Sequence, residues 1–317
     1  MISGHWKIFA KLVFSIALMA ILFALVDWRE GLSLLLAVDL TPLALVFVLY
    51  VVGLWLSSVK WRMLLVIQEV STTVAQLFRL YWTGAFIGNF LPSTVGGDFS
   101  RLAFLRSTNR LAEVAASIVL ERVTGLVVLL VFSVFSLSLR PQYFGDSFLL
   151  PALWLIVWAV LGLVSVIYIF SEYIVVWLNK LGLSEELLLS RVAVKAKKVL
   201  VAILLFREHT FVLLKCFVLS FIFYFLSFVA QYFIFYSLDL HVSVVEIMFI
   251  LPIISLISLI PISLNSFGLT ESVFVLFFVR AGLDSSEALA VALLGRALTI
   301  LFSSLGGIWW FIEKQKR

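Results

Sequence analysis

Residues 80–97 read LYWTGAFIGNFLPSTVGG, and residues 247–270 read IMFILPIISLISLIPISLNSFGLT. Both segments are apolar and uncharged, and each is interrupted by proline and glycine near one end. Proline removes a backbone donor and clashes with the preceding turn, so neither segment is expected to form a straight helix. In a membrane, broken backbone persists only where protein or a wet cavity covers it. We therefore predict two re-entrant hairpins, each entering and leaving by one face; a kinked full span is the alternative.

The composition places these segments in a membrane protein. Of the 317 residues, 63% are hydrophobic and 13% are charged, and the mean hydropathy is +1.18. Soluble domains have roughly 45–50% apolar and about 25% charged residues, so a soluble fold is excluded. A helix needs about 20 apolar residues to cross the bilayer core. The candidate spans are residues 8–26, 40–58, 112–139, 147–170, 215–238 and 287–312.

These patterns predict one all-α polytopic membrane domain over residues 1–317, with about six transmembrane helices plus two re-entrant helical hairpins. In this arrangement both termini lie on one side, which carries sixteen Lys and Arg residues, Lys60 and Arg101 among them. The opposite side carries only Arg29, Arg140 and Arg280. Because cytoplasmic loops are enriched in Lys and Arg, we predict that both termini are cytoplasmic and that the protein lies in the cell membrane.

Two segments interleave basic and apolar residues. Residues 172–208 do so at roughly helical spacing, which is typical of an interfacial amphipathic helix; a plain cytoplasmic connector is the alternative. Residues 59–70 (VKWRMLLVIQEV) have a similar character. Attraction to anionic headgroups explains both segments without specifying a substrate.

The two hairpins and the spans after them share an internal pattern. Each unit has a proline, a glycine turn, an acid, and later a glutamate followed nine residues on by an arginine. Asp98 precedes Arg122 by 24 residues, and Glu271 precedes Arg296 by 25. The two halves, residues 8–139 and 147–312, would have opposite orientations, which predicts an inverted three-plus-three repeat. Transporters use this architecture with a binding site near the midplane, although a fold alone does not define a function.

The two repeated arginines are predicted to lie deep in the membrane. Arg122 follows Glu113 by nine residues and Arg296 follows Glu287 by nine, which is roughly 13 Å along each helix. Each charge costs about 2.5–3.5 kcal/mol at the centre of a membrane helix, so both should face the bundle interior and have partners. A guanidinium group matches phosphate oxygens, which favours an anionic ligand such as a lipid phosphate.

The second arms of the hairpins add to this prediction. They begin at Gly97-Asp98 and Gly268-Leu269, and helix N-termini present free N–H groups and partial positive charge to an anion. The candidate substrate-binding residues are Arg122, Arg296, Asp98, Glu271, Arg101, Glu121, Asn89 and Asn265. The candidate turn residues are Pro92, Gly96, Gly97, Pro261 and Gly268.

A structural role for these groups is the alternative. Asp98 and Glu271 could cap their helices and pair with Arg296 and Arg122, respectively, as cross-links between the repeats. Glu121 points about 100° away from Arg122, the next residue in the sequence, and so toward a different partner. Arg101 either guides lipid headgroups or only helps to set the orientation of the protein in the membrane. Both asparagines, at 89 and 265, either satisfy the broken backbone or contact a ligand.

The strings NFLPSTVGGDFSRLAFLR, SIVLERVTGL, IPISLNSFGLTE and LLGRALT resemble the lysylphosphatidylglycerol synthase transmembrane-region family, also called flippase-like or UPF0104 proteins. The resemblance covers roughly residues 8–312. In the two-part members, this membrane module is linked to lipid translocation, and a separate soluble domain transfers the amino acid. The resemblance implies a lipid-translocase-like bundle with functional polar positions at Asp98, Arg101, Glu121, Arg122, Glu271 and Arg296. The second hairpin departs from the Gly-rich family pattern at residues 264–267.

Three classes of function remain. The first is a translocase for an anionic phospholipid or lipid-linked saccharide. The second is an enzyme acting on a lipid phosphate, with Asp98, Glu121 and Glu271 as acid–base groups, although HExxH, GxSxG and Walker patterns are absent from the sequence. The third is an accessory subunit of a cell-envelope lipid or polysaccharide synthase.

Other partners and cofactors are not expected. The single cysteine, Cys216, and three separated histidines predict neither a disulfide nor a metal site, and we expect no cofactor. Orientation charges account for the basic balance, so no nucleic-acid partner is expected. Only five residues follow residue 312, so lysyl transfer by this chain alone is not expected.

Overall fold

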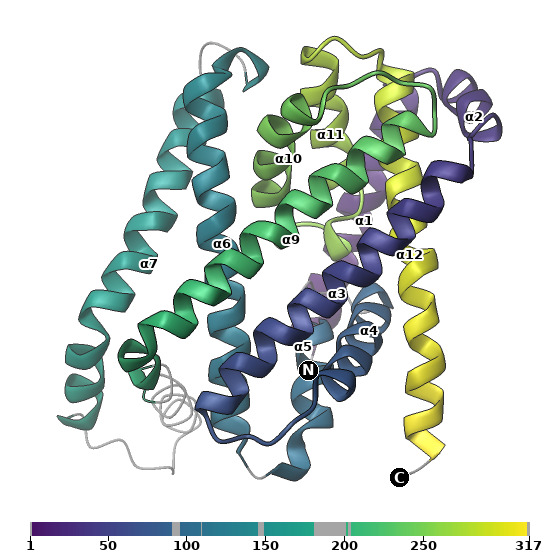
Figure 1. The fold of residues 1–317 in the computed structure, drawn as a ribbon. Helices are drawn as coiled ribbons and strands as arrows, with labels where there is room; N and C mark the ends of the chain where they lie inside the picture. Colours follow the sequence, from purple (N-terminus) through teal and green to yellow (C-terminus); the bar gives the residue numbers. More distant parts are fainter. Residues whose placement is uncertain are drawn as a thin grey trace.

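The computed structural model describes residues 2–90, 96–108, 110–144, 149–180, 201 and 204–315, and all regular structure within these residues is helical (Figure 1). The long helices are α1 (Ile2–Leu25), α3 (Thr41–Ile67), α6 (Leu111–Leu139), α7 (Leu149–Lys180), α9 (Thr210–Tyr236) and α12 (Ser285–Gln315). The shorter ones are α2 (Trp28–Leu36), α4 (Val74–Phe90), α5 (Gly96–Phe104), α10 (Val244–Ser258) and α11 (Leu269–Arg280). Single 3₁₀ turns are η1 (Arg106–Thr108), η2 (Pro141–Phe144), η3 (Leu205–His209) and η4 (Leu264–Ser266).

The all-helical membrane class predicted from the composition is confirmed. Within the described residues, four helices, α3, α6, α9 and α12, are long and apolar enough to cross a membrane. A fifth span results if Phe9–Leu25 and Trp28–Leu36, which are bent by 91°, count as one. The six predicted apolar stretches each fall largely within one long helix. Most of segment 172–208, including the predicted amphipathic stretch, lies outside the described residues.

Helix α2 was not predicted from the sequence. Asp27 caps it by accepting from the backbone N–H of Arg29 at 3.0 Å, which fits the preference for Asp at this position. Trp28, Leu32 and Leu36, four residues apart on one helix face, are exposed. The opposite face is held against α12, where the Ser286 hydroxyl donates to Glu30 at 2.8 Å.

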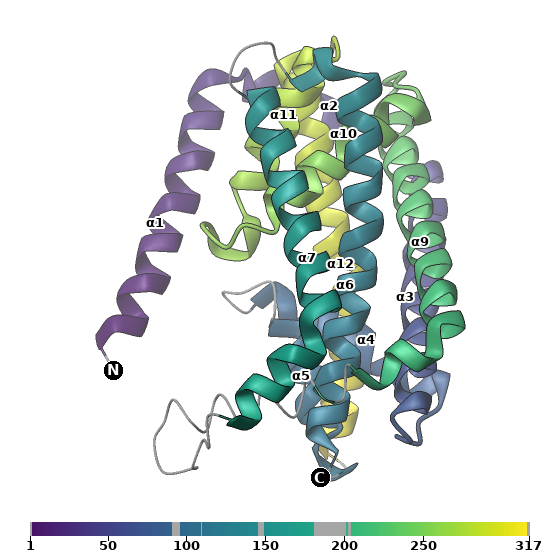
Figure 2. The ribbon, with the colours of Figure 1, turned by 90° about the vertical axis from the view of Figure 1, so that its left-hand side faces the viewer.

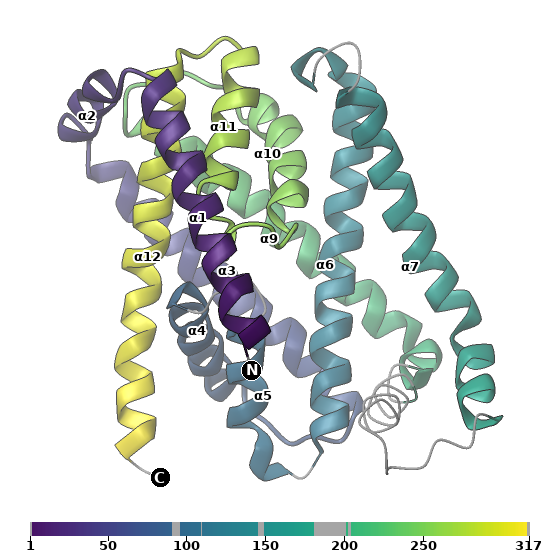
Figure 3. The same cartoon turned by 180° about the vertical axis from the view of Figure 1, so that it is seen from behind.

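The two interrupted segments each form a pair of short helices. Figures 1 and 3 place α4 and α5 in the lower half of the molecule and α10 and α11 in the upper half. α6 and α12 run along the full height, α6 contacting α5 and α10, and α12 contacting α4 and α11. Each long helix that follows a helix pair therefore also supports the other pair. α1 stands on one flank against α11 and η4 (Figure 2).

The largest apolar cluster fills the upper half of the bundle. Its ring contacts include Phe235 with Phe278 at 5.0 Å and Phe274 with Phe278 at 4.3 Å between centroids. A second cluster surrounds Trp61 and Leu65, both fully buried at the lower end of α3. Residues 59–67 therefore continue α3 and pack one face, which includes Lys60 and Trp61, against the core, whereas Arg62 and Val66 are exposed.

Helices α4 and α5 approach each other most closely through two glycines, Gly84 and Gly97. A Cβ added at Gly97 would lie 2.6 Å from the carbonyl oxygen of Gly84. We expect Gly97→Ala to lower the free energy of unfolding by about 1–3 kcal/mol, because the helices must separate to admit the methyl group. Thermal unfolding in detergent would measure it. Gly162→Ala, where nothing lies within 4 Å, is the matched control and should raise stability by up to about 1 kcal/mol. Equal losses in both variants would contradict the close-contact explanation.

Candidate functional site

Asp98 lies in the first turn of α5 and pairs with two arginines. One is Arg101, three residues later on the same helix, and the other is Arg122 on α6, which donates through Nε. The Asp98 side chain is 10% exposed and that of Arg122 is 43% exposed. The sequence predicted an enclosed Arg122, and the structure differs because Arg101 occupies the interior position beside the carboxylate.

Glu121 faces away from Arg122 and joins a second set of partners, as the helical geometry predicted. Arg101 donates to its Oε2 at 2.9 Å, and the Lys60 ammonium lies 3.7 Å from its Oε1. Lys60 also donates to the Glu121 backbone carbonyl at 3.3 Å and to Ser220 at 3.0 Å. Arg101 therefore bridges two buried carboxylates.

Arg101 and Lys60, counted as orientation charges in the sequence, are buried at 6% and 7% exposure. The rings of Tyr81 and Trp61 cover the Arg101 guanidinium at 4.2 and 4.9 Å from their centroids. An aromatic face attracts a cation more strongly when water is excluded. Arg101 is thus fixed by two carboxylates and two rings. The α5 cluster consists of Lys60, Asp98, Arg101, Glu121 and Arg122.

Glu271 and Arg296 form the corresponding contact in the upper half, which we call the α11 pair. Arg296 donates from Nε to Glu271 at 2.7 Å, and the Glu271 side chain is only 1% exposed. The other carboxylate oxygen accepts the Gly268 backbone N–H at 2.7 Å, which caps α11. Gly268 has φ +80°, and a Cβ there would lie 2.8 Å from the Ser15 carbonyl. Glycine is required at this position because it alone adopts positive φ without steric cost.

The loop before Gly268 supplies carbonyl groups to the same arginine. Asn265 and Ser266 have φ of 47° and 58°, and their carbonyl oxygens lie 3.5 and 3.4 Å from the Arg296 guanidinium nitrogens. The left-handed backbone thus turns two carbonyls toward one cation. Asn265 contacts Arg296 through its main-chain carbonyl, which accepts the hydrogen bond.

The acids pair within their own halves of the chain. Asp98 bonds to Arg122 and Glu271 to Arg296, each through Nε, at separations of 24 and 25 residues. The alternative in which each acid crosses to the arginine of the other half is wrong. The equal spacing reflects equal geometry, since an acid in the first turn of a short helix meets an arginine on the following long helix.

The remaining predicted residues take different positions. Asn89 donates to Ser303 of α12 at 2.5 Å and so joins two helices. Gly96 begins α5, and Pro261 lies exposed in the loop after α10. Pro92 lies outside the described residues.

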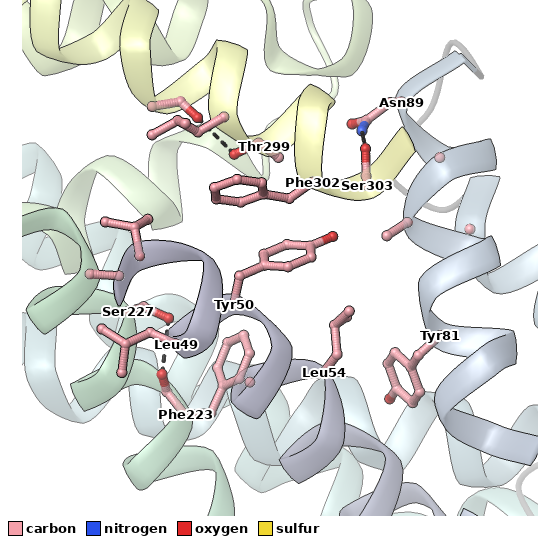
Figure 4. Close-up of a pocket in the computed structure, with 18 of the residues that line it drawn as sticks. Leu49, Tyr50, Leu54, Tyr81, Asn89, Phe223, Ser227, Thr299, Phe302 and Ser303 are labelled. Carbon is pink, nitrogen blue, oxygen red and sulfur yellow. Dashed lines mark hydrogen bonds between the residues drawn. The ribbon is translucent and has the colours of Figure 1, made fainter. Parts of the chain in front are cut away.

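A cavity of about 480 Å³ lies between α3, α4, α9 and α12 (Figure 4). Its wall is mostly apolar and aromatic, with Tyr50 and Phe302 in contact at 5.6 Å between ring centroids. Asp98, Arg101, Asn89 and Asn265 also line it. This central cavity therefore joins apolar surface to the α5 cluster.

A second cavity, of about 420 Å³, is lined by Glu271 and Arg296. The two cavities share four lining residues: Gln231, Ile234, Gly295 and Thr299. They meet where α9 and α12 approach each other, so the α5 cluster and the α11 pair border adjoining spaces.

The lysylphosphatidylglycerol synthase TM region family matches residues 8–307 of this chain. The chain belongs to this family. The UPF0104 membrane protein PH1989 of Pyrococcus horikoshii is 19% identical over 321 residues, covering 95% of this chain and 96% of that protein. No solved structure matches the chain. The resemblance read from the motifs is confirmed, and the protein is a multi-pass helical membrane protein.

In this lysylphosphatidylglycerol synthase TM region protein, the two sites differ in the charged groups that they bring together. The α5 cluster gathers three cations, Lys60, Arg101 and Arg122, around the carboxylates of Asp98 and Glu121. The α11 pair joins Arg296 to Glu271. The described residues hold no group of three or more His, Cys, Asp or Glu side chains that could bind a metal ion.

Proposed function

We propose that this protein is a translocase that moves an anionic phospholipid or lipid-linked saccharide between the two leaflets of the cytoplasmic membrane. One observation carries the proposal: the α5 cluster, which gathers Lys60, Arg101 and Arg122 around two carboxylates, borders a largely apolar cavity in a membrane bundle. Cations away from water are stabilised by negative charge, so an anionic headgroup in the cavity would add a favourable contact to Arg101 at its wall. The apolar wall suits the part of the lipid next to the phosphate.

The proposed mechanism is alternating access between two inverted halves. Six spans and two re-entrant helix pairs would form the three-plus-three repeat, with both termini cytoplasmic. The placement of α4–α5 and α10–α11 in opposite halves supports it (Figures 1 and 3), as does the matched Nε contact in each half. Transporters with broken helices bind their substrates where such repeats meet.

Each charged group has a proposed role. Arg101, held at the wall of the central cavity by Asp98 and Glu121, contacts the phosphate there, and Arg122, with 43% of its side chain exposed, supports it through the shared Asp98 carboxylate. Arg296 receives the same group after it passes into the second cavity. Guanidinium groups suit both steps because they remain charged and match phosphate oxygens.

Transport in proteoliposomes tests the proposal. Fluorescent phosphatidylglycerol and phosphatidylcholine in the inner leaflet become accessible to a membrane-impermeant quencher only after they cross. We expect the protein to accelerate crossing of the anionic lipid over the zwitterionic one. Arg122→Ala and Arg296→Ala should each slow it about tenfold or more, since a hydrogen bond to a charged group contributes about 1.5–3 kcal/mol.

Arg280→Ala is the matched control, because Arg280 is exposed at the end of α11 and borders neither cavity. It should transport at the wild-type rate. Crossing no faster than in protein-free vesicles, or unchanged crossing in both arginine variants, would overturn the proposal. Chemical conversion of the lipid, lost in Asp98→Asn, would instead identify an enzyme.

A further inference from the structure

Gln231 is a polar residue with incomplete hydrogen bonding, and it lies at the junction of the two cavities. It lies on α9 and lines both spaces. Its side-chain nitrogen Nε2 is buried and has no hydrogen-bond partner among the residues that the structure describes. Buried polar groups in native proteins are nearly always paired, so an unpaired donor at a binding cavity indicates a partner that arrives with the ligand.

The hydroxyl groups around the junction offer the complementary function. Ser227, one turn before Gln231, donates to the Phe223 carbonyl at 2.9 Å, and Thr299 donates to the Gly295 carbonyl at 2.8 Å (Figure 4). Ser258, in the second cavity, donates to the Ile254 carbonyl at 2.8 Å. A hydroxyl has one proton and two lone pairs, so each of these groups has only acceptor capacity left.

These groups distinguish between ligand chemistries. An ionised phosphate diester has only hydrogen-bond acceptors, and the junction offers it few donors. The arginines that could donate to a phosphate lie instead at the α5 cluster and the α11 pair. An alcohol group can accept from Gln231 Nε2 and donate to a Ser or Thr oxygen at once. The junction therefore matches a hydroxylated headgroup, and the charged sites match its phosphate.

We propose that Gln231 is a selectivity-determining residue, which binds a hydroxyl of the lipid headgroup where the two cavities meet. The inference rests on the proposed lipid translocation and specifies its substrate class as lipids with a hydroxyl-bearing headgroup, of the glycerol or sugar kind. It assigns the phosphate and the hydroxyl to different parts of the same path.

Two lipids of equal charge test the assignment. Phosphatidylglycerol carries two headgroup hydroxyls, and phosphatidylethanol with the same acyl chains carries none. Binding to the purified protein is measured by native mass spectrometry, and crossing is measured by the quenching assay. We expect the wild-type protein to prefer phosphatidylglycerol about fivefold to tenfold in both measurements, as one or two neutral hydrogen bonds would give.

Gln231→Leu should abolish this preference by weakening phosphatidylglycerol alone, leaving phosphatidylethanol within about twofold of wild type. Gln76→Leu, at an exposed position on α4, is the matched control and should keep the preference. An unchanged preference in Gln231→Leu, or no preference in the wild-type protein, would overturn the inference. A Gln231-dependent preference in binding without any crossing would retain the subsite and reject the translocase.

Discussion

Glu271→Ala is expected to lower the free energy of unfolding by about 3–5 kcal/mol, the usual cost of removing one partner from a buried ion pair. The Glu271 side chain is 1% exposed, and one of its oxygens bonds to Arg296 at 2.7 Å. The other oxygen accepts the Gly268 N–H at 2.7 Å. The variant would leave a largely enclosed guanidinium without its counter-ion and a helix N-terminus without its cap. Thermal and denaturant unfolding in detergent would measure the loss.

Glu246→Ala provides the matched control. Glu246 occupies the same capping-box position at the start of α10, where it accepts the Ser243 N–H at 3.0 Å in an exposed setting. Losing the cap alone should cost about 1 kcal/mol. Glu271→Gln keeps an acceptor for Gly268 but removes the charge, so its stability should lie between those of the other two variants. If Glu271→Gln were as stable as wild type, the ion pair would contribute nothing measurable.

Much of this arrangement could be predicted from spacing. In the second apolar segment, Pro261 and Gly268 lie where the helix breaks, because neither residue fits a straight continuous helix there. The 24- and 25-residue separations identified Asp98 with Arg122 and Glu271 with Arg296 as equivalent pairs. Whether an acid pairs within its half or across to the other depends on how the helix pairs sit in space. Spacing along one chain does not contain that information, and the cross-linked alternative was wrong for this reason.

Buried cations were harder to predict than buried acids. Lys60 and Arg62 flank Trp61, a pattern typical of a membrane interface, yet Lys60 shares the buried face with Trp61 and Leu64. The helical spacing of that face was the available signal. For Gln231 the sequence signal was simpler, since Gln231 is the single side-chain amide in α9. Helix α2 was not predicted, although Trp28, Leu32 and Leu36 repeat every four residues.

Arg101→Ala is expected to have the largest effect in the lower half of the molecule, a loss of about 3–5 kcal/mol or failure to fold. Arg101 contacts Asp98 and Glu121, whose side chains are each 10% exposed, and lies over two aromatic rings. Among the described residues, its removal leaves Glu121 with the 3.7 Å contact to Lys60 as its remaining ion pair. The void between the rings adds a packing loss to the electrostatic one.

Arg110→Ala separates this burial effect from the loss of an arginine as such. Arg110 pairs with Glu69 at 3.2 Å, with side chains 42% and 80% exposed, and donates to the Gln68 carbonyl at 2.8 Å. The exposed pair contributes about 0–1 kcal/mol and the hydrogen bond about 1.5–3 kcal/mol at most, so this variant should lose less stability than Arg101→Ala. Arg101→Lys keeps the charge but cannot extend two donors in a planar fork to both carboxylates. Its stability should therefore be intermediate. Wild-type stability in Arg101→Lys would mean that charge alone, without the bridge between Asp98 and Glu121, holds α5 against α6.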